Sequence, residues 1–114
     1  MPQEYRAFQE KVVQNAVAGT ANGDSFIVAT SSGAYNQLAF QITGIVTATV
    51  TFEATINGND WVPFFMVNLA SNSGATTATA NGIYRQSVLG LLAVRARISA
   101  HTNGTITING LATA

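Results

Sequence analysis

Apolar and polar residues alternate along most of the chain after residue 24, with the period of two that is typical of β-strands facing a core on one side. The clearest run is Ile45–Ile56, where apolar residues at the even positions are separated by threonines and by Glu53. Leu92–Ser99 alternates in the same way and carries Arg95 and Arg97 on its polar side. The pattern predicts strands, and no helix, in this part of the chain.

Shorter apolar or alternating runs predict five more strands, at residues 25–30, 37–42, 61–67, 83–88 and 105–112. Pro63 has no N–H to donate to a ladder, so the third of these strands is expected at a sheet edge or at a bulge. The segment Asn68–Ala78 is small, polar and rich in turn-forming residues. It is predicted to be an exposed loop.

Glycine-containing turn signals separate these runs. Asn-Gly pairs favour tight hairpin turns because both residues tolerate positive φ. The segments Asn57–Asp60 and His101–Gly104 each lie between two alternating runs, and Thr43-Gly44 is expected to end a strand. Short strands at this spacing predict an all-β fold, an antiparallel β-sandwich or jelly roll of seven to eight short strands.

The first 24 residues differ from the rest. They hold dense charge at Glu4, Arg6, Glu10 and Lys11 and show no clean alternation. Phe8 and three valines could line one face of a short helix, but such a helix would be marginal by itself. We therefore expect residues 1–24 to form an extended N-terminal arm or edge segment, beside a β-sandwich domain over residues 25–114.

Charge is scarce in this chain of 114 residues, which is long enough for one domain. Charged residues make up 9% of it and the net charge is zero, whereas an average domain carries about 25% charged residues. This suits a protein whose surface is covered in an assembly; a Thr/Asn-rich secreted β-domain is the alternative. No basic cluster indicates a nucleic-acid partner, and no apolar run reaches the ~20 residues of a membrane helix.

Candidate chemistry is sparse. The chain has no cysteine and one histidine, His101, in a predicted turn. Asn57, Asn59 and Asp60 supply one carboxylate, too few for a calcium loop. Glu53 and Asp60 are glycosidase candidates only by default. We therefore expect no enzyme activity, cofactor or metal, and a cross-strand pair between Glu53 and Arg95 or Arg97.

The interface candidates are Glu4, Arg6, Phe8, Lys11, Pro63, Phe64, Phe65, Arg95 and Arg97. Arg95 and Arg97 are expected to face either solvent or a carboxylate of a neighbouring subunit. The second alternative arises because arginine is common in interfaces and binds carboxylates through two parallel hydrogen bonds. Strand alternation cannot bury every aromatic near Pro63, so an apolar edge at Pro63–Met66 is expected to reach a partner. Trp61 is expected to anchor the core. Exposed aromatics that stack on sugar rings would be the alternative use of this region.

The part of the chain after residue 45 resembles small β-sandwich virion proteins of tailed bacteriophages. These proteins often show a "TVTFE" strand followed by a turn and Trp, then "GLYRVDVSGY", "VRVRV" and "SGTVTV". The matching segments here are Thr49–Trp61, Gly82–Val88, Gly90, Val94–Ile98 and Gly104–Ile108. Where that family often has Asp-Gly, this chain has Asn57–Asp60.

The resemblance implies a capsid decoration (cement) protein, a homotrimer or other small homo-oligomer that binds the major capsid protein on the outside of the head. It implies no catalytic residue. The protein would be made in the host cytoplasm and end up in the virion. A tail, baseplate or head-fibre module is the closest alternative, and a carbohydrate-binding module is the alternative from another class.

Overall fold

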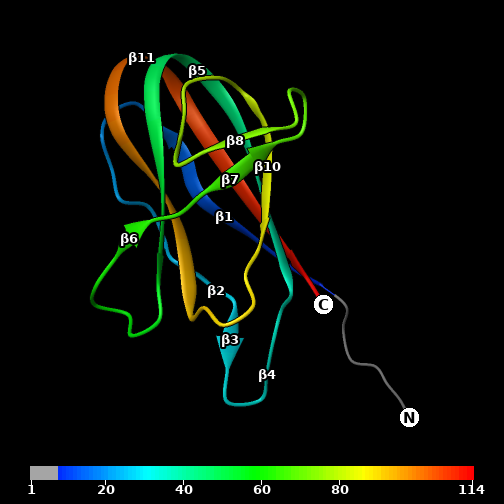
Figure 1. Ribbon diagram of the computed structural model, residues 1–114. Coiled ribbons are helices and arrows are strands. Elements are labelled where there is room, and N and C mark those ends of the chain that lie inside the picture. Colours follow the sequence, from blue (N-terminus) through cyan, green and yellow to red (C-terminus); the bar gives the residue numbers. More distant parts are fainter. Residues whose placement is uncertain (1–7) are drawn as a thin grey trace.

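The computed structural model describes residues 8–114, which form eleven β-strands and no helix (Figure 1). Accordingly, no helix in this range is long and apolar enough to cross a membrane. The all-β antiparallel architecture predicted from the sequence is confirmed. The strands are β1 Phe8–Val17, β2 Phe26–Ile27, β3 Ala29–Thr30, β4 Gly33–Ala34, β5 Gln37–Thr55, β6 Val62–Pro63, β7 Met66–Asn68, β8 Ser73–Ala75, β9 Thr77–Ala78, β10 Gly82–Ser87 and β11 Ala93–Thr113.

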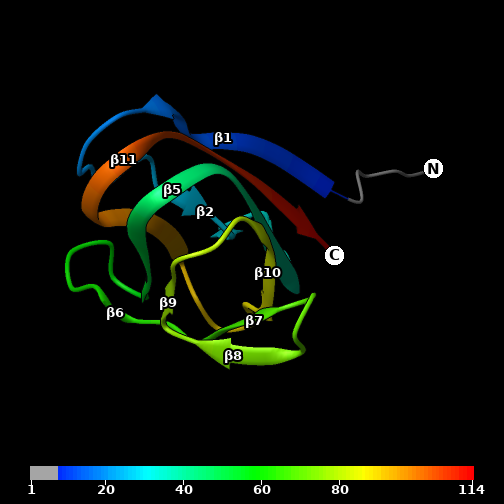
Figure 2. The same cartoon turned by 90° about the horizontal axis from the view of Figure 1, so that it is seen from above.

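Two long strands organise the molecule. β5 and β11 pair antiparallel from Gln37↔Thr113 at one end to Thr55↔Ala93 at the other. Halfway along, the ladder bends, so that its two halves form the opposing layers of a sandwich (Figures 1 and 2). One half is flanked by β1 and β10, followed by β7 and β8. The other half is flanked by β2, β6 and β9.

Two glycines on opposite strands allow the bend. Gly44 has a φ of 88° and Gly104 a φ of 114°, conformations that L-residues with a side chain rarely adopt. Their backbones also approach closely: a Cβ at Gly44 would collide with the carbonyl oxygen of Thr105, and one at Gly104 with that of Gly44. The register shifts several times between Ile98 and Thr107, as expected where bulges curve a sheet.

The predicted strand end at Thr43-Gly44 and the predicted hairpin at His101–Gly104 are both wrong. Each segment is a bend within one continuous strand. Asn81 stabilises the bend from outside: its Oδ1 accepts a hydrogen bond from the Ile45 N–H at 2.8 Å, and its Nδ2 donates to the Ile45 carbonyl at 3.3 Å. A side-chain amide thus replaces a neighbouring strand at this position.

The core lies between the two halves of the bent ladder. Phe40 and Phe52, both on β5 but on opposite sides of the bend, stack with ring centroids 6.1 Å apart and planes 3° from parallel. Tyr84 of β10 packs on Phe52 at 5.4 Å. The alternation read from the sequence therefore points to one shared core, with Leu38, Ile42, Val50, Ile98, Ile106 and Ile108 among its fully buried members.

Other strand boundaries also differ from the prediction. The predicted strand 25–30 is divided into β2 and β3, and the predicted strand 61–67 into β6 and β7. Asn68–Ala78 is not a simple loop, because β8 pairs with β7 and β9 pairs with β5. Pro63 lies in the two-residue strand β6 beside β5, so the expectation of a peripheral position is confirmed.

The N-terminal strand β1 is the outermost strand of the layer that contains β10. It pairs with β11 from Phe8↔Thr113 to Val17↔Ile106, with bulges after Val12 and Gln14. Val13 is buried in the core. Gln14 donates from Nε2 to the carbonyls of Ala21 and Ala96. Residues 8–17 therefore form part of the sandwich as an edge strand.

Candidate functional site

The most concentrated polar chemistry lies on the outward side of the second half of the ladder. There Glu53 of β5 sits between Arg95 on β11 and Pro63 on β6, its two cross-strand neighbours. Arg97 follows two residues along β11, opposite Thr51. We call this surface the arginine face; its residues are Thr51, Glu53, Trp61, Pro63, Arg95, Arg97 and Ser99.

Glu53 binds both arginines, so the predicted cross-strand pair is confirmed for each. Its Oε1 accepts from Arg95 Nε at 2.8 Å and from Arg97 Nε at 3.1 Å, and its Oε2 accepts from Arg97 Nη2 at 3.2 Å. The side chain of Glu53 is 11% exposed, against 19% for Arg95 and 32% for Arg97. The carboxylate that faces the two arginines is therefore the chain's own.

Two opposing influences act on the pKa of Glu53. Burial is the largest and disfavours the charged form. The hydrogen bonds from Arg97 and Arg95, together with their positive charges, outweigh burial and leave the pKa below the ordinary value. Glu53 is therefore ionised at neutral pH, and both its oxygens are occupied by arginine donors. A carboxylate held in this way is a poor proton acceptor, which makes it unsuited to general-base catalysis.

Trp61 packs against Arg95 and does not anchor the core, so that expectation is wrong. Its side chain is only partly buried, and the Arg95 guanidinium lies 4.4 Å from the ring centroid. This cation–π contact holds Arg95 on one side of the ring while Glu53 holds its Nε. Trp61 belongs to the loop before β6, whose position is set by Pro63 pairing with Glu53.

The arginine face is preorganised for binding acceptor groups. The remaining N–H donors of Arg95 and Arg97 make no further hydrogen bond within residues 8–114. A hydroxyl pair continues the polar surface, since Thr51 Oγ1 and Ser99 Oγ lie 2.7 Å apart. A shallow depression of about 400 Å³ adjoins Arg97, Ser99 and Asn22. The surface carries two positive charges and one negative charge and can receive carboxylates or carbonyl oxygens.

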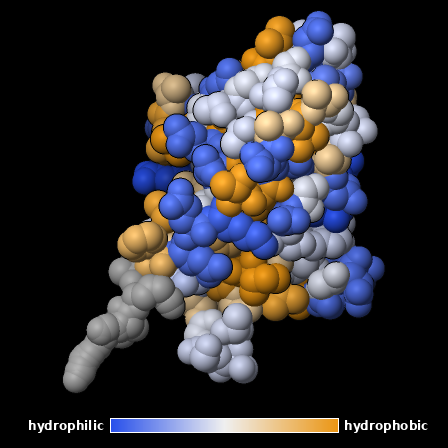
Figure 3. Space-filling model, turned by 180° about the vertical axis from the view of Figure 1, so that it is seen from behind, coloured by the Kyte–Doolittle hydropathy of each residue, from blue (hydrophilic) through white to orange (hydrophobic). Residues whose placement is uncertain are grey.

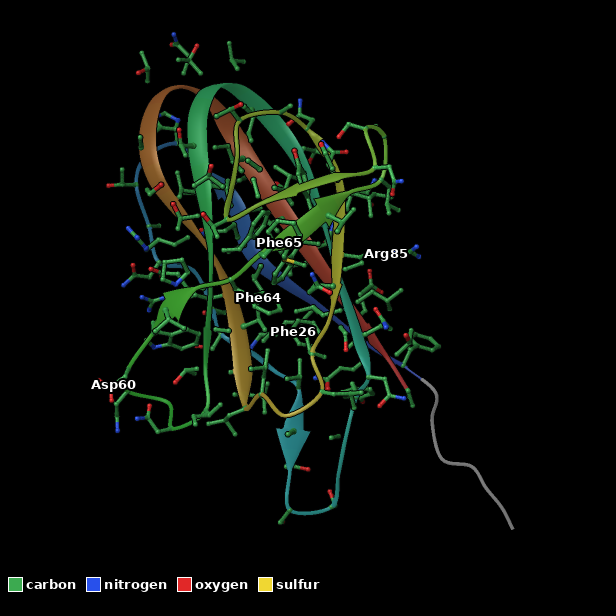
Figure 4. All side chains as sticks on the ribbon, in the orientation of Figure 1. Phe26, Asp60, Phe64, Phe65 and Arg85 are labelled. Carbon is green, nitrogen blue, oxygen red and sulfur yellow. The ribbon has the colours of Figure 1, made fainter. Side chains whose placement is uncertain are left out.

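The aromatic residues beside Pro63 divide between the core and the surface. Met66 is fully buried and Phe64 packs partly against the core, so these two do not form an exposed apolar edge. Phe65 is half-exposed, and its ring lies directly over Gly74 of β8. Figure 4 shows Phe64 and Phe65 over the middle of the sandwich, whereas Asp60 lies out on the loop before β6.

The N-terminal interface candidates lie elsewhere. Glu4 and Arg6 fall outside the described residues. Phe8 is 57% exposed at the start of β1. Lys11 is half-buried, and its Nζ donates to the Ser25 carbonyl at 3.4 Å. Both residues belong to β1, which pairs with the half of the ladder that does not carry the arginine face.

The Asn57–Asp60 segment forms the turn that the sequence predicts. Asn57 Oδ1 accepts from the N–H groups of Asn59 and Asp60 at 2.8 Å, and Asn57 Nδ2 donates to Asp60 Oδ2. The only carboxylate of the loop is thus engaged in the turn. Within residues 8–114 no three acidic, histidine or cysteine side chains gather as metal ligands would. His101 Nε2 lies 2.7 Å from the Gly104 carbonyl, where it supports the bend.

Comparison with known proteins gives fold neighbours. No protein-family profile and no curated protein sequence matches the chain. The SPBc2 prophage-derived protein YomS superposes with a TM-score of 0.84 at 16% identity, covering 94% of this chain and 93% of that one. The PBSX exported protein XepA superposes with a TM-score of 0.88 at 17% identity, covering 98% of this chain and 39% of that one.

These comparisons establish the fold. The sandwich with a bent central ladder is shared with a prophage-derived protein over nearly its whole length. In XepA a similar unit makes up about two fifths of a longer chain.

Proposed function

We propose that this protein is a structural component of a tailed-phage particle, a decoration protein that binds the outside of the capsid through its arginine face. The observation that carries the proposal is the arginine face itself, where Glu53 holds both arginines, Trp61 packs on Arg95, and further N–H donors make no hydrogen bond within residues 8–114. Rigid donors of this kind suit attachment to a protein surface, because little side-chain freedom is lost on binding.

Two further observations support a role in a phage. A prophage-derived protein has the same fold, and the virion-protein resemblance covers the strands that carry Glu53, Arg95 and Arg97. The scarcity of charge outside the arginine face fits a surface that is covered in an assembly. In the proposed mechanism the protein binds the assembled shell but not its dissociated subunits, and mass action then stabilises the shell.

The carbohydrate-binding alternative has less support. Sugar rings stack on an open aromatic face, but one face of Trp61 is occupied by Arg95 and the Phe65 ring lies on Gly74. An enzymatic role has no support from these residues, because both oxygens of Glu53 are bound by arginine and Asp60 is hydrogen-bonded within its turn.

A second candidate comes from the name of the other neighbour. XepA is described as an exported protein, so this chain would, on that analogy, leave the cell free of any particle. The two candidates predict different locations. The exported form would be found in the culture fluid after particles are removed, and the virion component would sediment with the particles.

The test uses purified protein and the particles of the phage whose genome encodes it. The protein should co-sediment with mature heads and raise the temperature at which they release DNA. Arg97→Ala should weaken that binding while the protein stays folded, and Asp24→Asn, which removes an exposed charge outside the arginine face, should not. Binding to tails but not to heads would show that the protein has a role in the tail or baseplate and not on the capsid. No binding to any particle would overturn the proposal.

A further inference from the structure

A second outward surface lies on the opposite layer of the sandwich, across β1, β11, β5 and β10. On β5 and β11 the alternate residues are buried in the core, so their neighbours point away from it, and the cross-strand partners of these neighbours on β1 and β10 lie on the same side. The strand registers align these outward residues in three rows. We call this surface the β1–β10 face; its rows are Phe8–Thr113–Gln37–Ser87, Glu10–Leu111–Ala39–Arg85 and Val12–Asn109–Gln41–Ile83.

This face is partly apolar and uncovered by the described residues. Four large apolar side chains on it are 40–57% exposed: Phe8, Val12, Ile83 and Leu111. A shallow depression of about 400 Å³ lies at its middle, next to Ala39 and Leu111. Figure 3 views the molecule from behind, where β1 lies, and shows apolar side chains interspersed among hydrophilic ones on that side. Such a mixture resembles the composition of interfaces between separately folded partners.

The charges of this face lie at its two ends. Glu10 begins the middle row on β1, and Arg85 ends it on β10. Three strand spacings, roughly 14 Å, separate them, and neither forms an ion pair within residues 8–114. Figure 4 shows Arg85 projecting away from the sandwich. The face therefore presents a negative end and a positive end that the described chain leaves unmatched.

We propose that the β1–β10 face pairs with the same face of a second copy, about a two-fold axis that runs parallel to the strands between β5 and β11. Rotation about this axis lays β1 of one copy over β10 of the other and β11 over β5. The strand direction is kept, so each row faces its own counterpart. An interface of this kind uses one patch on both copies and must be complementary to itself.

The residues of the Glu10 row and of the Val12 row meet that condition. Glu10 of each copy faces Arg85 of the other, which makes two symmetric ion pairs. In the same row Leu111 faces the small side chain of Ala39, so that large and small residues interdigitate. In the next row Val12 faces Ile83, and the two amides Asn109 and Gln41 face each other. No like charges are brought together.

The size of the face sets the expected strength. Four strands of five residues cover roughly 19 Å by 17 Å on each copy, which is below the size of standard specific interfaces and in the range of weak, transient ones. We therefore expect a weak dimer, with a dissociation constant of roughly 100 micromolar or higher. This proposed pair is a small homo-oligomer, as the family resemblance implies, but with two copies where a trimer is expected. It leaves the arginine face free, so it does not rest on the proposed function and is measured without any phage component.

The test is sedimentation-velocity analysis of the full chain over a range of concentrations, with charge-reversed variants. Glu10→Arg and Arg85→Glu should each weaken the dimer by roughly tenfold or more, because each creates two like-charge contacts. An equimolar mixture of the two variants should dimerise again, since every arginine then faces a glutamate across the axis. The chain with both substitutions should dimerise for the same reason. Asp60→Arg reverses the charge of an exposed residue outside this face and should leave the dissociation constant of the dimer unchanged.

Three results would overturn the proposal. A wild-type chain that stays monomeric to high concentration excludes the pair. An oligomer that neither single reversal weakens uses another surface. Single reversals that weaken association without rescue in the mixture place Glu10 and Arg85 in an interface of different symmetry. Circular dichroism of each variant separates these outcomes from loss of folding.

Discussion

The arginine face and the β1–β10 face both lie on strands β5 and β11, on either side of one bend, but the charged residues of the two faces are arranged differently. On the arginine face the ladder places Glu53 directly beside Arg95 and within reach of Arg97, so the charges bind one another. On the β1–β10 face Glu10 and Arg85 share a row but lie three strands apart. Direct cross-strand neighbours stabilise the chain, whereas charges separated along a row stay available to a partner.

The largest effect is expected at the bend that separates the two faces. Gly44→Ala forces a side chain into a φ of 88° and against the Thr105 carbonyl. We expect a loss of about 3–5 kcal/mol in the free energy of unfolding, measured by urea denaturation. Gly19→Ala, where a Cβ meets no atom within 4 Å, should change it by less than about 0.5 kcal/mol. A Gly44→Ala chain as stable as wild type would show that the bend is not where the ladder is constrained.

The second largest change in stability is expected at Glu53, and Glu10 on the other face serves as its comparison. Glu53→Gln removes the charge that two partly buried arginines bind, and we expect a loss of about 1–3 kcal/mol in unfolding free energy. Glu10→Gln, on the exposed β1–β10 face, should cost less than about 0.5 kcal/mol when measured on the monomer at low concentration. Equal losses in the two variants would contradict the distinction between the faces.

Acid should remove the contribution of Glu53. Because its pKa is lowered in the folded state, its contribution is fully present above the unfolded value of about 4.3. It is lost as the pH falls through the lower folded value. The stability difference between wild type and Glu53→Gln should therefore shrink between pH 5 and strongly acidic conditions, as followed by urea denaturation across that range. A constant difference would mean that the ion pair is not its source.

The smallest effect concerns the aromatic cover of the arginine face. Trp61→Leu removes the cation–π contact with Arg95 and should cost about 0.5–1 kcal/mol. The same substitution made in an Arg95→Gln background should cost less, because the contact is already gone. If the two costs are equal, Trp61 acts through packing alone.

The sequence predicts the strands and the charge pair better than the connections between strands. Alternation shows which residues point inward, and it places Glu53 on the same side of the ladder as the arginines. It does not distinguish the bend at Gly104 from a hairpin, because both need a residue with positive φ. The deciding feature is the close approach to Gly44 on the other strand, which is a tertiary contact.

The predictions for Trp61 and for the segment Asn68–Ala78 are wrong for a related reason. The apolar bulk of Trp61 favours the core, but the loop before β6 sets its direction and Arg95 supplies its contact. The small polar residues of β8 and β9 form strands because β7 and β5 offer edges to pair with. Apart from Thr77, their own side chains carry little strand preference.

Imaging of intact particles of the phage proposed to encode the chain by electron cryomicroscopy, with mass spectrometry of the same preparation, tests the central claim most directly. The account predicts that the chain is present in purified particles and that the bent-ladder sandwich appears at regular positions on the outer head. Its arginine face should lie against the major capsid protein. Particles that lack the chain, while it accumulates free in the culture fluid, would contradict a structural role in the virion.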